Sequence, residues 1–287
     1  MSRITYVNGR YLPYVDALVH VEDRGFQFAD AVYEVIAIRR GGLVDEAWHL
    51  ARLARSLGEI KMVPPMGEAA LKMVLREVVR RNRVQNGLLY LQVSRGAAPR
   101  DFVFPRDARP TLVVMARSQR RQDPRLLEEG VGVITVPDIR WARPDIKTVG
   151  LLANSLGKQQ ARAAGAYEAW QVDRDGRVTE GTSTNAWIVT PEGEVVTRQA
   201  DHSILNGVTR RGLLQLLSGE GLHLVERPFS VAEAKAAREA FLTSTTNFIL
   251  PVVSIDGAPV ANGHPGTLTL RLRALYDAYV AAQRGAP

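Results

Sequence analysis

Runs of strand-forming residues alternate with segments of helical periodicity along the whole chain. Residues 32–38 are rich in β-branched and aromatic side chains and are followed by Gly41-Gly42. Apolar residues then recur at helical spacing over 45–60 and again over 68–81. This alternation predicts a mixed fold of the α/β (α+β) kind.

The same patterns place the remaining elements. Asn8-Gly9 predicts a hairpin, because both central residues of the favoured turn need positive φ. Ser230-x-x-Glu233 is a capping box, which predicts a short helix. Strands are expected at 4–7, 10–12, 32–38, 88–94, 111–116, 131–136, 168–173, 186–189, 240–244 and 249–255. Longer helices are expected at 45–60, 68–81, 152–164, 209–218 and 267–283.

A polar stretch at 117–125 is the best candidate for a domain boundary. We therefore expect a smaller N-terminal α/β domain at 1–118 and a linker at 119–124. A larger C-terminal α/β domain would span 125–287 and carry Lys147. A length of 287 residues suits one large or two modest domains.

Composition excludes several classes of protein. The chain has no cysteine, so disulfides, thiolate nucleophiles and cysteine metal sites are excluded, and we expect no metal site. Its net charge is +7, but the basic residues are scattered and no nucleic-acid motif accompanies them. The N-terminus lacks the apolar core of a secretory signal, and no apolar run is long enough to span a bilayer. We expect a cytoplasmic protein that binds neither nucleic acid nor membrane.

Lys147 is one of only five lysines, the others being Lys61, Lys72, Lys158 and Lys235. It follows an expected strand, within Trp141-Ala-Arg-Pro-Asp-Ile-Lys147. An amine in an apolar setting is suited to forming a Schiff base with a carbonyl. Taken alone, a lysine is more often a solvated surface residue, so the assignment depends on its companions.

One carboxylate and several hydroxyl-rich turns could accompany that lysine. Glu180 precedes a run of small hydroxylated residues, and an acid of this kind could hold a proton on a pyridine nitrogen. Asn206-Gly-Val-Thr209 opens an expected helix, where unpaired N–H groups favour an anion. Thr243-Ser-Thr-Thr246 ends an expected strand, and Arg52 could give a charged hydrogen bond to a phosphate. Read alone, each is an ordinary turn, cap or solvated helix face.

Together these residues resemble the D-amino-acid transaminases, which belong to the fold-type IV enzymes that use pyridoxal 5′-phosphate (PLP). The similarity covers nearly the whole chain, and its matching stretches follow one another in the same order. They are Glu22-Asp-Arg-Gly-Phe-Gln-Phe28, Val32-Tyr-Glu-Val35, Arg95-Gly96 with Pro99-Arg100, Asp138-Ile-Arg-Trp141, Asp145-Ile-Lys147, Thr179-Glu-Gly-Thr-Ser183 and Thr243-Ser-Thr-Thr246.

The resemblance implies a two-domain fold-type IV architecture and a role for each matching residue. Lys147 would carry PLP as a Schiff base and move the proton, and Glu180 would pair with the pyridine nitrogen. Arg52, Val208, Thr209 and Thr245 would hold the phosphate. Tyr33 and Arg100 would face the substrate, with Arg100 reaching in from the partner subunit of a homodimer.

Two departures from the family pattern bear on the substrate. The usual Arg-x-His motif for the substrate carboxylate is Arg100-Asp101-Phe102 here, and the phenyl ring lacks a hydrogen-bond donor. Ala29 and Ala31 stand where the family usually has glycines. The expected reaction moves an amino group between a D-amino acid such as D-alanine and a 2-oxo acid such as 2-oxoglutarate. Alternatives are an aminodeoxychorismate lyase, an (R)-amine transaminase or a branched-chain transaminase.

Overall fold

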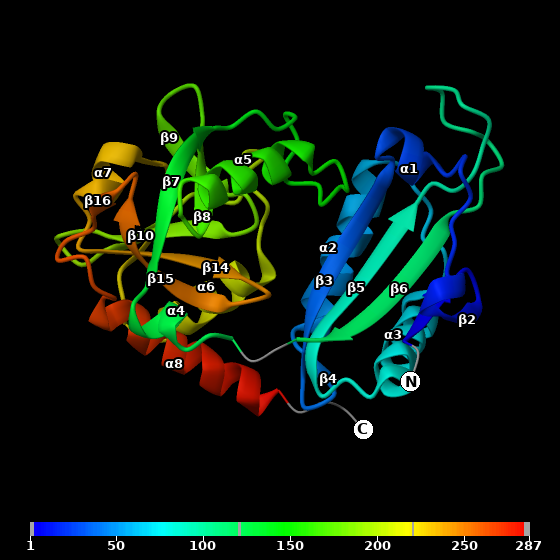
Figure 1. Ribbon diagram of the computed structural model, residues 1–287, viewed down its shortest axis with the longest axis horizontal. Coiled ribbons are helices and arrows are strands. Elements are labelled where there is room, and N and C mark those ends of the chain that lie inside the picture. The colour runs from blue at the N-terminus through cyan, green and yellow to red at the C-terminus, as the bar shows by residue number, and fades with distance from the viewer. Residues whose placement is uncertain (1–2, 120–121, 220, 284–287) are drawn as a thin grey trace. The chain divides into compact units, whose positions relative to one another are not determined.

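The computed structural model describes residues 3–119, 122–219 and 221–283, and the chain divides into two units (Figure 1). One unit comprises Met1–Arg120, Ile146–Gly150 and Ala281–Pro287, and the other comprises Arg121–Asp145 and Leu151–Val280. The expected linker at 119–124 includes positions 120 and 121, which lie outside the described residues.

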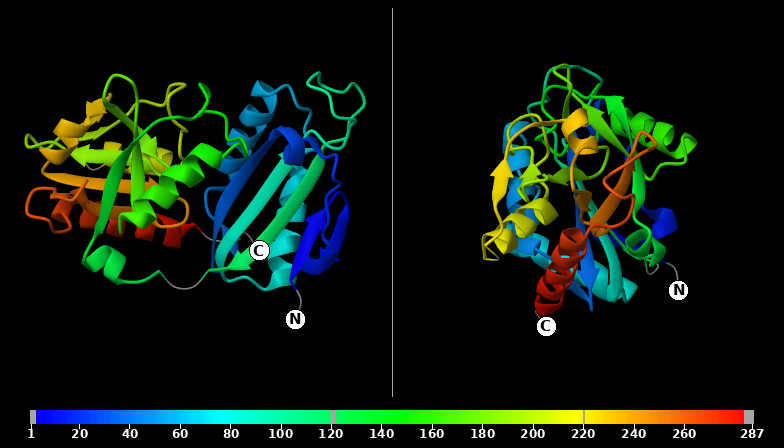
Figure 2. Two further views of the ribbon diagram at one scale, coloured as in Figure 1. Left: turned by 45° about the horizontal axis from the view of Figure 1, so that its top comes forward. Right: turned by 90° about the vertical axis from the view of Figure 1, so that its left-hand side faces the viewer.

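The first unit is built on an antiparallel sheet in the order β2-β1-β6-β5-β3-β4. Two amphipathic helices cover one face of it, α2 against β3 and α3 against β6 and β1 (Figure 2). Alternate strand residues such as Ile36 and Leu91 meet helix residues such as Leu53 and Leu75 in the core. The elements are β1 Ile4–Val7, β2 Arg10–Pro13, η1 Tyr14–Asp16, α1 Arg24–Phe28, β3 Ala31–Arg39, β4 Gly42–Leu43, α2 Glu46–Glu59, α3 Glu68–Asn82, β5 Asn86–Ser94 and β6 Thr111–Ser118.

The second unit is built on a mixed sheet in the order β12-β11-β10-β14-β15-β7-β8-β9-β13, with β16 paired to β15. Its central strands are buried on both faces; every residue of β10 is buried. The elements are α4 Arg125–Glu128, β7 Val131–Pro137, α5 Leu152–Ala163, β8 Glu168–Val172, β9 Arg177–Gly181, β10 Asn185–Val189, β11 Val195–Thr197, α6 Val208–Gly219, β12 Leu224–Glu226, β13 Phe229–Ser230, α7 Val231–Lys235, β14 Glu239–Ser244, β15 Phe248–Ile255, β16 Ala258–Pro259 and α8 Thr267–Ala282.

The mixed α/β class is confirmed, and so is the local turn and cap chemistry. The hairpin of β1 and β2 turns at Asn8 and Gly9, whose φ values are 43° and 90°. Ser230 caps α7 by accepting a hydrogen bond from the Glu233 amide at 3.0 Å. The sequence pattern did not predict β9, because its residues Arg177–Gly181 are mostly polar although four of the five are buried.

Lys147 was expected in the C-terminal domain, but its segment Ile146–Gly150 groups with the first unit. The reason is main-chain pairing with β3: Thr148 forms a β-bridge with Val32, and the Tyr33 amide donates to the Lys147 carbonyl at 3.0 Å. Such pairing uses no particular side chain, so it leaves no pattern in the sequence.

The described residues contain no helix that is long and apolar enough to cross a membrane. They also contain no group of histidine and acidic residues placed to hold a metal ion.

Candidate functional site

Lys147 reaches Tyr33 in the first unit. The Nζ atom of Lys147 donates to the Tyr33 hydroxyl at 3.3 Å and lies 4.3 Å from the centre of its ring. The Tyr90 ring stacks on the Tyr33 ring with their centres 5.7 Å apart. Burial, together with the neighbouring Tyr33, raises the pKa of Tyr90 to about 12. The lysine is half-buried. The structure therefore brings together the predicted Schiff-base lysine and a predicted substrate residue.

The main chain around Lys147 is also held by hydrogen bonds. Its carbonyl accepts from the Tyr33 amide, and the Val149 amide donates to the Ala31 carbonyl at 3.1 Å. The Lys147 amide donates to the Ser56 hydroxyl of α2 at 3.4 Å. These contacts hold the segment Ile146–Gly150 along β3. The backbone that carries the lysine side chain is therefore fixed.

Arg52 lies on α2 and is bound to Glu34, the neighbour of Tyr33 on β3. Its guanidinium donates to both carboxylate oxygens of Glu34, at 2.7 and 2.8 Å, and His49 Nδ1 lies 2.7 Å from the same carboxylate. Burial alone would raise the pKa of Glu34, but the charge and hydrogen bonds of Arg52, aided by His49, lower it to about 2. Burial lowers the pKa of His49. This buried cluster fixes one side of the guanidinium expected to meet the phosphate.

Arg100 and Phe102 lie on an exposed loop of the first unit. The Phe102 ring packs on Phe28 with centres 5.5 Å apart, and the Arg100 guanidinium lies 5.0 Å from the centre of the Phe28 ring. A guanidinium of Arg24 anchors the loop by donating to the Asp101 carbonyl. Across the described parts of the chain, Arg100 has no hydrogen bond or ion pair of its own. Its charge is therefore open to an anion from outside.

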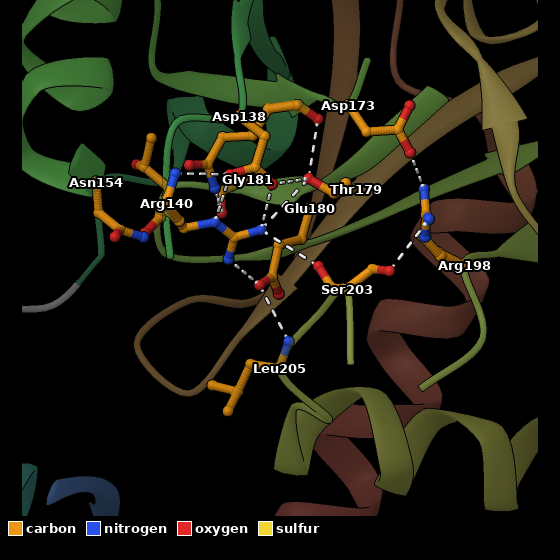
Figure 3. A network of polar contacts seen from close by, with 12 residues as sticks. Asp138, Arg140, Asn154, Asp173, Thr179, Glu180, Gly181, Arg198, Ser203 and Leu205 are labelled. Carbon is orange, nitrogen blue, oxygen red and sulfur yellow. Dashed lines mark hydrogen bonds and ion pairs between the residues drawn. The ribbon is translucent and has the colours of Figure 1, made fainter. Parts of the chain in front are cut away.

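Glu180 is the penultimate residue of β9 in the second unit, and three groups donate hydrogen bonds to its carboxylate; Figure 3 labels two of them, Arg140 and Leu205. The donors are the Arg140 guanidinium, the Asn185 amide at 2.9 Å and the main-chain amide of Leu205 at 3.0 Å. The residue is 5% exposed. Three donors hold this buried carboxylate in a fixed direction.

Arg140 is itself held in place by Asp138. The Nε and Nη2 atoms of Arg140 donate to the two oxygens of Asp138 at 3.0 and 2.7 Å, and Thr179 adds a hydroxyl donor at 2.8 Å. Burial would lower the pKa of Arg140, but Asp138 and Glu180 outweigh it and raise the pKa. Burial would raise the pKa of Asp138, but Arg140 and Thr179 lower it. Asp138 and Arg140 therefore each favour the charged form of the other.

Asn185 links Glu180 to the two predicted phosphate turns. Its amide nitrogen donates both to Glu180 and, at 2.9 Å, to the Leu205 carbonyl, just before Asn206-Gly207. In the sheet, Asn185 is the register partner of Thr243, which starts the hydroxyl-rich turn. A side chain at Gly207 would lie 2.1 Å from the Asn185 oxygen, so the chain passes too close for a Cβ atom.

The second unit therefore carries a carboxylate and hydrogen-bond donors that could hold part of the expected cofactor. Val208 and Thr209 open α6, where the first N–H groups of a helix lack acceptors inside the helix. Thr245 is half-buried in the turn between β14 and β15. These donors suit a phosphate, and the Glu180 carboxylate suits a protonated ring nitrogen. The structure places Glu180, Val208, Thr209 and Thr245 in this unit, and Lys147, Tyr33, Arg52, Arg100 and Phe102 in the other.

The sequence did not assign roles to Arg140, Asn185 and Leu205. These residues lie 40, 5 and 25 positions from Glu180 in the chain, so their meeting depends on the fold. The one sequence signal available was that Arg140 and Asn185 lie within or beside stretches that match the family.

Comparisons with known proteins place the chain in a family. The family model for amino-transferase class IV matches residues 31–255. A D-alanine aminotransferase of Bacillus licheniformis is 42% identical over 262 residues, which cover 91% of this chain and 92% of that protein. A D-alanine aminotransferase of Staphylococcus haemolyticus is 37% identical over 276 residues, covering 96% and 97%.

Solved structures show the same fold. A branched-chain aminotransferase from the archaeon Thermoproteus uzoniensis, with norvaline, superposes with a TM-score of 0.87 at 26% identity and covers 99% of this chain and 96% of its own. A T.th. branched-chain amino acid aminotransferase with pyridoxamine 5′-phosphate has a TM-score of 0.91 at 24% identity, covering 99% and 96%. At its lower identity the second match supports the fold alone.

Proposed function

Because this chain belongs to the amino-transferase class IV family and is a PLP-dependent aminotransferase, we propose that it moves an amino group between a D-amino acid and a 2-oxo acid. The observation that carries the choice of D-amino acids is the 42% identity to a D-alanine aminotransferase over 262 residues. Arg100 supports it, since an exposed guanidinium without an ion-pair partner in the described chain suits a substrate carboxylate.

Each residue of the site has a part in the proposed reaction. When bound, PLP supplies an electron sink for the carbon that loses its proton. The Lys147 amine would hold the cofactor and carry the proton, with its Nζ atom guided by the Tyr33 hydroxyl at 3.3 Å. Glu180 would keep a proton on the ring nitrogen, because its buried charge is fixed by Arg140, Asn185 and Leu205. Val208, Thr209, Thr245 and Arg52 would hold the phosphate.

We also propose that the enzyme is a homodimer in which Arg100 serves the partner's site. Large apolar side chains are exposed in two segments of the first unit, 15–26 and 102–103, which is typical of an interaction surface. Val15, Leu18, Val21, Phe26, Phe102 and Val103 are each between 72% and 81% exposed in the single chain. Cytoplasmic location, expected from the sequence, remains a prediction.

A substrate panel tests the reaction. The protein should be yellow with PLP and should convert D-alanine and 2-oxoglutarate to pyruvate and glutamate, faster than it uses L-leucine or an (R)-amine. Lys147→Ala should abolish turnover, and borohydride should fix the cofactor to the peptide that contains Lys147. A clear preference for L-leucine would favour the branched-chain alternative, and pyruvate from aminodeoxychorismate would favour the lyase.

Mixing an inactive and an impaired variant tests the source of Arg100. In a mixed dimer of Lys147→Ala and Arg100→Ala chains, one site would combine an intact lysine with an intact arginine from the other chain. Activity on D-alanine should therefore rise above that of either variant on mixing after reversible dissociation. If mixing restores no activity although the dimers exchange chains, Arg100 acts within its own chain.

A further inference from the structure

The turn between β14 and β15 contains a bulky residue in a conformation that usually requires glycine. Thr245, Thr246 and Asn247 form the turn, and Ser244 and Phe248 are register partners on either side of it. Phe248 has a φ of 58°, in the left-handed region. In short hairpin loops this position is normally glycine, because a Cβ atom clashes there. The backbone at Phe248 is therefore strained.

Burial of the Phe248 ring accounts for only part of this strained conformation. Phe248 is 4% exposed, and its ring packs against Tyr276 of α8 with centres 5.3 Å apart. The contact fixes the side chain but places no direct restraint on the peptide groups around it. Strained residues persist where the surroundings over-determine them, and they concentrate at ligand sites.

Arg273 supplies the missing restraint on the backbone. Its Nη1 atom donates to the carbonyl of Asn247 and to the carbonyl of Ile249, both at 2.9 Å. These two carbonyls flank Phe248. Asp277, one helical turn along α8, holds the guanidinium through its Nε atom at 2.7 Å. A charged donor bound to two carbonyls makes a strong clamp on this strained segment.

The remaining polar groups of the turn are mostly engaged. The Ser244 and Thr246 hydroxyls lie 3.1 Å apart, the Asn247 amide nitrogen of the main chain donates to Ser244, and the Asn247 side chain bonds to the Tyr167 hydroxyl. In the residues that the structure describes, the Thr245 hydroxyl makes no hydrogen bond. It is the turn's side-chain group left for a ligand.

We propose that Arg273 is a positioning residue for cofactor binding: it holds the Thr245–Asn247 turn in the shape that receives the phosphate, by clamping the carbonyls on either side of Phe248. Arg273 acts through the turn, and α8 supplies it from outside the cofactor residues. The inference rests on the proposed function, in which Thr245 meets the phosphate of PLP.

Binding of PLP and of pyridoxal, which lacks the phosphate, to the apo-protein tests this role by absorbance titration. Arg273→Met should weaken PLP binding roughly 10- to 150-fold, which is the effect of losing one hydrogen bond from the turn to the charged phosphate. Pyridoxal binding should change less than about twofold, because the turn matters only to the phosphate. Arg273→Lys keeps the charge and should lie between wild type and Arg273→Met.

Two further comparisons separate positioning from general damage. Arg271→Met makes the same change at an exposed position of α8 and should leave PLP affinity unchanged. In a Thr245→Val background, Arg273→Met should have a smaller effect than it has alone, because both changes act on one contact.

Each result decides for or against the clamp. Equal losses for PLP and pyridoxal would give Arg273 a structural role only, and so would full additivity with Thr245→Val. PLP affinity unchanged in Arg273→Met would also overturn the clamp. If Arg273→Met does not fold, the same binding measurements are made on Arg273→Lys. Failure of the proposed function gives a different result, since wild type would then not bind PLP or would not use D-alanine.

Discussion

Glu180 and Arg100 are the two charged residues expected to meet the two ends of the reacting system, and their surroundings are opposite. Glu180 is 5% exposed and accepts three hydrogen bonds, and the arginine that binds it is paired in turn with Asp138. Arg100 lies on an exposed loop against aromatic rings, without an ion pair in the described chain. The carboxylate expected to meet the cofactor is held by the fold of one unit, whereas the guanidinium expected to meet the substrate has no counter-ion among the described residues.

This contrast predicts that the two arginines, Arg140 and Arg100, contribute to different properties. Arg140→Met should lower the free energy of unfolding by about 3–5 kcal/mol, because it leaves the buried Glu180 and the half-buried Asp138 without their cation. Urea unfolding of the apo-protein measures this. A loss below about 1 kcal/mol would mean that the network is hydrated and adds little to stability.

The buried carboxylate of Glu34 in the first unit should also contribute to the stability of the fold. The pKa of Glu34 lies near 2 in the folded protein, against an ordinary value of 4.5. A lowered pKa stabilises the fold above pH 4.5, and this contribution, about 3 kcal/mol, disappears as the pH falls from 4.5 towards 2. Urea unfolding of wild type and Glu34→Gln at several pH values measures it.

The decisive observation is how the difference in free energy of unfolding between wild type and Glu34→Gln varies with pH. The stability advantage of wild type should be constant above pH 4.5 and shrink towards pH 2. An advantage that did not depend on pH would show that Arg52 and His49 do not lower the Glu34 pKa.

Arg100→Ala should affect catalysis and leave stability almost unchanged. Losing a hydrogen bond to the substrate carboxylate should cost about 1.5–3 kcal/mol of transition-state stabilisation, which lowers kcat/KM for D-alanine roughly 10- to 150-fold. Unfolding should change by less than about 0.5 kcal/mol, as for most surface positions. An (R)-amine without a carboxylate serves as the matched substrate, and an equal loss on it would contradict the carboxylate role.

The smallest effect is expected at Ala29, which ends α1 just before the strand that carries Tyr33. Ala29 has a φ of 55°, a left-handed conformation that alanine adopts at a cost. Ala29→Gly should therefore raise the free energy of unfolding by about 1 kcal/mol. A matched Ala→Gly change at Ala161, inside α5, should lower it instead. If both changes destabilise, the strain at Ala29 is relieved elsewhere.

Local patterns were enough to predict the longer elements. Helices α2 and α3 followed from apolar spacing, and the capped start of α7 followed from Ser230 and Glu233. Strand β9 was missed because its polar residues Thr179 and Glu180 are buried by partners from distant segments. Periodicity reports which residues prefer water, so it fails where hydrogen bonds make burial of polar groups favourable.

The site was predictable only to the level of single residues. Lys147, Glu180 and Tyr33 were named from their motifs, and the contact between Lys147 and Tyr33 spans 114 positions of the chain. The role of Asn185 needed the sheet register that sets it beside Thr243. Physical contact between distant segments is a property of topology, which no short motif encodes.

The pairing of the Lys147 segment with β3 has a consequence for how the enzyme is made. During synthesis β3 leaves the ribosome more than a hundred residues before Lys147, so its edge waits for a partner from later in the chain. A fragment that starts at residue 122 would contain the lysine but no strand to fix its main chain. Co-expressed halves that restored a borohydride-sensitive lysine would show that this one stretch of pairing can assemble from separate pieces.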